Sequence, residues 1–111
     1  MEEYRTEFGF INFDFIVNEK YPNGLLLFMG SYIYKEFRNQ GKFKEMVLNL
    51  FFNFPRETEV QVPLLDKKLV PMFEKMGFIK VKELEYWGEC SNSIKMKGYL
   101  NFLNKSVTEV I

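Results

Sequence analysis

The segment Leu25–Tyr34, LLLFMGSYIY, is apolar on both of its alternating faces. Strands that are covered on both sides show this pattern, whereas strands with one solvated face alternate apolar and polar residues. Apolar residues then recur at helical spacing from about Lys42 to Phe54, and Pro55 ends that pattern. The chain must therefore fold around a central strand that leads through a short loop into a helix.

Two further segments predict strands beside this unit. Glu7–Val17 alternates phenylalanine and isoleucine with polar residues, and we expect one strand with a bulge near Gly9–Phe10, where the phase changes. Thr58–Leu65 alternates as well, with Glu59 and Gln61 on the polar face. Pro63 cannot donate to a sheet ladder. This strand must therefore lie at an edge, or part from its neighbour around Pro63.

The C-terminal part predicts a short helix and a hairpin. The helix leads to Gly77, a natural left-handed residue after a helix. Phe78–Trp87 and Ser93–Phe102 are typical of strands, and turn residues join them. A strand–helix–strand crossover implies at least one parallel pair. The fold class is therefore α/β: a mixed, largely antiparallel sheet with helices packed on it, in one domain of 111 residues.

Composition limits the chemistry. The chain has no histidine, which excludes a Ser-His or Cys-His triad, and its single cysteine, Cys90, makes a metal site unfavourable. Fifteen basic and fifteen acidic residues give no excess charge for a nucleic-acid partner. The acidic start, MEEYRTEF, differs from a signal peptide, and no apolar run is long enough to span a membrane. We expect a cytoplasmic protein.

The loop before the first helix, RNQG, has the composition of an anion site. The first backbone N–H groups of a helix have no partner within the helix, and the helix dipole favours an anion there. Gly41 lets a ligand approach the backbone, and Arg38 can add charge-assisted hydrogen bonds. The alternative is that Gly41 is an ordinary turn glycine and Arg38 a solvated cation.

Two motifs together resemble the GNAT N-acetyltransferases, over roughly Leu25–Phe102. The strand and helix joined by Arg38-x-x-Gly41-x-Phe43 are similar to the acetyl-CoA motif of that family, Arg/Gln-x-x-Gly-x-Gly/Ala. Phe73-x-x-x-Gly77-Phe78 is similar to the second motif, Tyr-x-x-x-Gly-Phe. The resemblance implies central strands that splay apart to admit pantetheine, and Pro63 suits that gap.

The resemblance also implies a function, transfer of an acetyl group from acetyl-CoA to an amine by direct attack in a ternary complex. The acceptor would be a small molecule or a protein lysine or N-terminus. No enzyme nucleophile is needed. The residues that it implies for binding the co-substrate are Tyr32, Ile33, Arg38, Asn39, Gln40, Gly41, Lys42, Phe43, Lys44 and Phe73.

Catalytic residues are not fixed by these motifs, because Phe43 replaces Gly or Ala and Phe73 replaces a tyrosine that donates a proton. Asp14 is a candidate base, with Glu7 and Glu59 weaker ones, and Tyr99 and Tyr86 are candidate proton donors. The alternative function is a non-catalytic protein of this fold that acts through protein–protein contacts. The missing N-terminal elements are compatible with a homodimer in which a second subunit completes the acceptor site.

Overall fold

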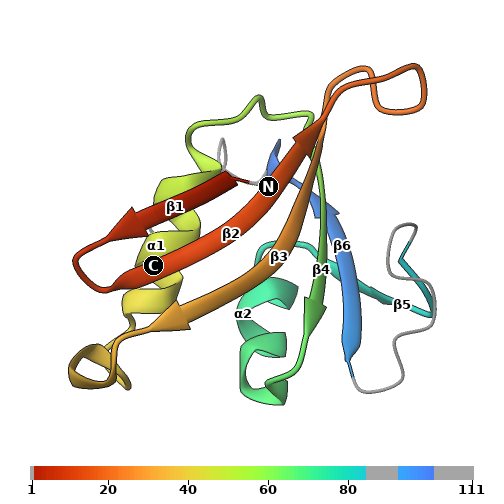
Figure 1. Cartoon of the computed structure of the whole chain (residues 1–111). Helices are drawn as coiled ribbons and strands as arrows, with labels where there is room; N and C mark the ends of the chain where they lie inside the picture. The colour runs from red at the N-terminus through yellow and green to blue at the C-terminus, as the bar shows by residue number, and fades with distance from the viewer. Residues whose placement is uncertain (1, 85–92, 102–111) are drawn as a thin grey trace.

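The computed structural model describes residues 2–84 and 93–101, which form a six-stranded sheet with helices on one side (Figure 1). The strand order is β1-β2-β3-β4-β6-β5, and β3 and β4 are parallel while the other described neighbours are antiparallel. The strands are β1 (Glu2–Thr6), β2 (Gly9–Ile16), β3 (Leu25–Ile33), β4 (Glu59–Leu64), β5 (Ile79–Val81) and β6 (Ile94–Tyr99). The helices are α1 (Lys42–Phe51) and α2 (Val70–Lys75), each after a short 3-10 turn, η1 (Lys35–Phe37) or η2 (Lys67–Leu69). The mixed, largely antiparallel class is confirmed.

The strand predicted at Glu7–Val17 is present as β2, and the sequence did not predict β1, which precedes it. A tight turn at Glu7–Phe8 joins β1 and β2 in a hairpin, in which Thr6 pairs with Gly9. The phase change at Gly9–Phe10 therefore marks the end of a turn rather than a bulge. Most of β1 is polar and exposed, so its apolar pattern is weak and its strand conformation depends on pairing with β2.

Both helices pack on one face of the sheet. A single core cluster joins residues of α1 and α2 to Ile11, Leu26 and Val60 of three strands. Figure 1 shows α1 behind the N-terminal strands, and α2 behind the centre of the sheet. The apolar spacing of α1 explains this, since Met46, Val47, Leu50 and Phe51 recur at helical spacing and are buried together. The helix begins at Lys42 as predicted, but ends at Phe51, three residues before the predicted end.

The opposite face of the sheet is also covered where β3 begins. Leu25 and Leu27 form a second cluster with Tyr21, which confirms that this strand is buried on both sides. Glu59 and Gln61 of β4 face the same side, yet their exposed fractions are only 8% and 3%. The sequence placed them on the face opposite Val60 and Val62, which is confirmed, but it did not predict that this face is covered as well.

The C-terminal hairpin is present as an antiparallel pair of β5 and β6, with β5 at the sheet edge. Of the strand predicted at Phe78–Trp87, the described residues up to Leu84 contain β5 at Ile79–Val81. Tyr86, Trp87 and Cys90 lie outside the described residues. Within the described part of the chain, no helix is long and apolar enough to cross a membrane.

Gly98 offers a test of packing between β6 and the core. A Cβ atom at Gly98 would overlap the ring of Phe78, which is buried and lies 5.3 Å from the ring of Phe73 between centroids. We expect Gly98→Ala to lower the free energy of unfolding by about 1–3 kcal/mol, as overpacked cores do. Urea denaturation followed by circular dichroism measures this loss.

The control is the double variant Gly98→Ala with Phe78→Leu, in which a smaller side chain leaves room for the new methyl group. Its loss of unfolding free energy should be smaller than the sum of the two single losses. Strictly additive losses would contradict a steric overlap between Gly98 and Phe78.

Candidate functional site

The two central strands separate after a short ladder. β3 and β4 pair only at Leu25–Leu27 with Glu59–Gln61, although β3 continues to Ile33 and β4 to Leu64. Figure 1 shows the two strands diverging toward their C-terminal ends. Beyond Leu27 and Gln61 the facing backbone edges have no ladder bond to each other. Such edges present N–H and C=O groups that an extended ligand can pair with.

A bulge in β3 lies where the separation begins. Asn12 of β2 pairs with Gly30 and Phe13 pairs with Phe28, so Met29 is an extra residue on β3. A bulge bends its strand and increases the local twist. Residues Leu25–Phe28 are buried, and Met29–Tyr32 are exposed, which places the change in environment at the bulge.

Pro63 lies on the edge of β4 that faces the separation. Glu59 N–H donates to Gly24 O on the β3 side at 3.0 Å, and Leu100 N–H donates to Thr58 O on the β6 side at 3.2 Å. Backbone groups alternate between the two edges of a strand. Pro63 lies four residues after Glu59, so its backbone nitrogen faces the same edge of β4. The N–H that proline lacks would therefore have pointed to the β3 side. β4 is central, and the prediction that it parts from its neighbour around Pro63 is confirmed.

The loop from β3 to α1 ends at a helix start without a side-chain cap. Gly41 is the N-cap residue, with φ 72° and ψ 12°, and no side chain caps the helix there. A Cβ atom added to Gly41 would meet no atom within 4 Å. The backbone N–H groups of Lys42 and Phe43, in the first helical turn, have no acceptor within the helix.

Two loop side chains, Arg38 and Gln40, fold back onto the protein. Arg38 Nε donates to Ile33 O at 2.9 Å, and its guanidinium lies 5.1 Å from the centre of the Tyr32 ring. Gln40 Nε2 donates to Glu36 O at 2.9 Å, and Asn39 has a left-handed φ of 63°. In this structure Arg38 thus fixes the loop to the end of β3, so an anion at the helix start would meet backbone amides first.

The two phenylalanines of the motifs both face the core. Phe43 is partly buried and packs against the core cluster, so its ring leaves the helix start uncovered. Phe73 is fully buried, and its ring lies 6.4 Å from that of Phe28 and 5.3 Å from that of Phe78. The structure gives Phe73 a packing role and leaves its ring inaccessible to a ligand. Lys42 lies over the Phe8 ring at 4.4 Å, and Lys44 is half-buried.

The catalytic candidates lie apart from this loop. Asp14 is half-buried on β2 and pairs in register with Leu27. Tyr99 OH donates to Glu59 Oε1 at 3.2 Å, and Gln61 Nε2 donates to Glu59 Oε2 at 2.7 Å. Burial raises the pKa of Tyr99 above its usual value of 10, and the Glu59 carboxylate raises it further. The sequence did not single out Gln61; the alternation of β4 hid it, because both faces of that strand are covered.

The fold and the separated strands define a GNAT-like architecture. The chain is similar to a solved structure, described as Arabidopsis thaliana Naa50 in complex with the bisubstrate analogue CoA-Ac-MVNAL, with 13% sequence identity and a TM-score of 0.56. The match covers 82% of this chain and 64% of that chain. No family model and no curated protein sequence matches this chain. The likeness is one of fold.

The Tyr99–Glu59 contact predicts a pH dependence. The folded chain holds the phenolic proton of Tyr99 more tightly than the unfolded chain does. The contribution of the protonated Tyr99 to the free energy of unfolding is therefore complete below pH 10. It is lost as the pH rises through the folded-state pKa. NMR titration of ¹³Cζ-labelled tyrosine, assigned with Tyr99→Phe, should show Tyr99 ionising above its usual value. Glu59→Gln should lower that pKa, and titration of Tyr99 below pH 10 would contradict the contact.

Proposed function

We propose that this chain transfers an acetyl group from acetyl-CoA to an amine. One observation carries the proposal: parallel strands β3 and β4 separate after three paired positions, and β3 leads to a helix start that no side chain caps. The Naa50 structure that shares the fold holds an analogue in which CoA is linked to a peptide. That likeness supports the same class of co-substrate and acceptor here.

The residues present fit CoA at two places. The amides of Lys42, Phe43 and Lys44 can donate to a pyrophosphate, and Gly41 leaves the approach open. The facing edges of β3 and β4 can pair with the amide groups of the pantetheine arm. We assign the first contact to the backbone rather than to Arg38, because Arg38 Nε is already bound to Ile33 O.

Acetyl-CoA supplies a thioester whose carbonyl carbon accepts the amine nitrogen and whose thiolate leaves. The N–H groups of Ser31 and Ile33 face the unpaired edge of β3, because Tyr34 N–H donates to Phe8 O on the β2 side and backbone groups alternate between the two edges. There they can stabilise the negative charge that develops on the carbonyl oxygen. The amine attacks in its neutral form, the proton that its nitrogen loses on forming the amide passes to water, and water protonates the departing thiolate. Phe73 is buried and carries no hydroxyl group, so it cannot serve in proton transfer.

Gly41→Glu tests the pyrophosphate contact. The new carboxylate would stand at the helix start, where its bulk and like charge oppose the pyrophosphate. We expect binding of acetyl-CoA to fall by at least about a hundredfold, a loss of about 2.7 kcal/mol. Isothermal titration with acetyl-CoA measures the affinity, and thiol release with a panel of amines measures turnover.

Gly77→Glu is the matched control. Gly77 also has a positive φ, 87°, and a Cβ there also meets no atom within 4 Å, so backbone strain and added charge are alike. Gly77 follows α2 instead of preceding α1. Equal affinity of the two variants and the unchanged protein for acetyl-CoA would overturn the assignment of the loop. Undetectable binding to the unchanged protein at millimolar acetyl-CoA would overturn the function itself.

A further inference from the structure

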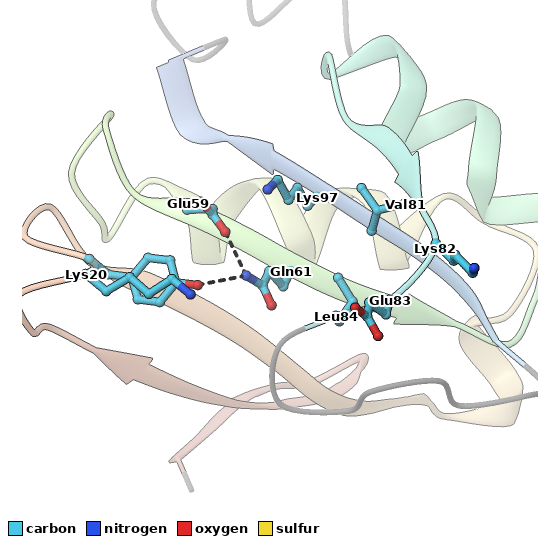
Figure 2. Close-up of a pocket in the computed structure, with 9 residues that line it drawn as sticks. Lys20, Glu59, Gln61, Val81, Lys82, Glu83, Leu84 and Lys97 are labelled. Carbon is cyan, nitrogen blue, oxygen red and sulfur yellow. Dashed lines mark hydrogen bonds between the residues drawn. The ribbon is translucent and has the colours of Figure 1, made fainter.

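A cavity of about 730 Å³ lies on the face of the sheet opposite the helices (Figure 2). β4, β6, the turn before β3 and the segment after β5 contribute to its wall, with Glu59, Gln61, Lys97, Tyr21 and Leu84 among the lining residues. This volume suits a small organic molecule or the end of a peptide. The acetyl-CoA contacts proposed above use none of these side chains.

The deepest polar groups of the cavity are a carboxylate and an amide. Gln61 Nε2 donates to Glu59 Oε2 at 2.7 Å and to Tyr21 OH at 3.5 Å. A carboxylate only accepts hydrogen bonds, so the NH₂ end of the amide must face Glu59. The carbonyl end, Oε1, therefore points the other way. Among the residues that the structure describes, it has no hydrogen-bond partner.

This unpartnered oxygen is a feature that calls for a ligand. Gln61 is 97% buried, the complement of its 3% exposed fraction. Leaving a buried acceptor unpaired costs about 1–3 kcal/mol. Glu59 lies beside it, 8% exposed, and its two oxygens use two of about four acceptor positions. A group that fits both residues must donate several N–H bonds and carry positive charge.

The lysines around the cavity do not reverse its preference for a positively charged ligand. Lys20 is exposed and Lys97 is half-buried, so water screens their charges more than that of Glu59. Figure 2 shows Lys82 pointing away from Gln61. Lys97 pairs in register with Gln61 across the strands, so its charge opposes an incoming positive group.

We propose that this cavity binds a primary ammonium group, held by Gln61 Oε1 and the Glu59 carboxylate. Gln61 is also the last residue of β4 that pairs with β3, so the bound amine would lie beside the point where the strands separate. The further assignment of this cavity as the acceptor site of acyl transfer rests on the proposed function, and there the bound ammonium must first release a proton to water, because only the neutral amine attacks a thioester. Binding of the amine alone does not require acetyl-CoA.

The test uses n-butylamine as the probe, at pH 7 where it is protonated, with n-butanol and butanoate as matched comparators. In ¹H–¹⁵N NMR titrations of the full chain without acetyl-CoA, we expect n-butylamine to shift the Gln61 side-chain resonance. Its dissociation constant should be on the order of 1 mM, because so few atoms make contact. Neither comparator should produce that shift at the same concentration.

Two variants should change this affinity in opposite directions. Glu59→Gln removes the negative charge and should weaken n-butylamine binding by about tenfold or more. Lys97→Met removes the opposing charge and should tighten binding by about two- to fivefold. Glu74→Gln is the control for Glu59→Gln: it replaces the same residue type on the exposed surface of α2 and should leave the affinity for n-butylamine unaltered.

The proposal would be overturned if Glu59→Gln tightened n-butylamine binding and Lys97→Met weakened it. It would also be overturned if butanoate bound more tightly than n-butylamine, since the cavity would then bind an anion. Equal responses to n-butylamine and n-butanol would also overturn it, as would undetectable n-butylamine binding by the correctly folded chain. Acetyl-CoA titration of the same variants separates the two proposals. Amine binding with no acetyl-CoA binding would contradict the proposed function alone, and the converse would contradict the amine site alone.

Discussion

The separation of two parallel strands is the constraint on which the rest of this structure depends. β3 and β4 give up a continuous ladder at the centre of the sheet, where unpaired backbone groups are costly unless water or a ligand satisfies them. The bulge at Met29 and the proline at position 63 both act at this point. One bends a strand away, and the other removes the N–H that would have closed the gap.

The sheet remains intact because the helix side of the core bridges the gap. Phe28 of β3 lies just before the bulge, and its ring contacts those of Phe51 in α1 and Phe73 in α2. Side-chain packing thus joins the two halves of the sheet where hydrogen bonds do not. This explains why Phe73 is fully buried, and why a residue that the motif placed near the co-substrate serves the core instead.

Local patterns in the sequence predicted the central strand, the start of α1 and the parting of β4 near Pro63. Each depends on neighbouring residues only: double-sided apolar alternation, helical spacing, and a missing donor. β1 was missed because an exposed edge strand needs little apolar pattern, and its conformation depends on its partner. The burial of Glu59 and Gln61 was missed for a related reason. Polar residues in an alternating strand indicate solvent only when the second face of the sheet is open.

The position of Gln61 connects the two halves of the candidate site. Its backbone is the last point at which β4 holds β3, and its side chain turns into the cavity beside Glu59. The side-chain amide of Gln61 donates to the Glu59 carboxylate at 2.7 Å. Gln61, the last residue of the β3–β4 ladder, thus orients the carboxylate that would bind an amine. A ligand entering between the strands and an amine in the cavity would therefore approach the same residue from different sides. The gap in the ladder is then the place where a thioester and a nucleophile could meet.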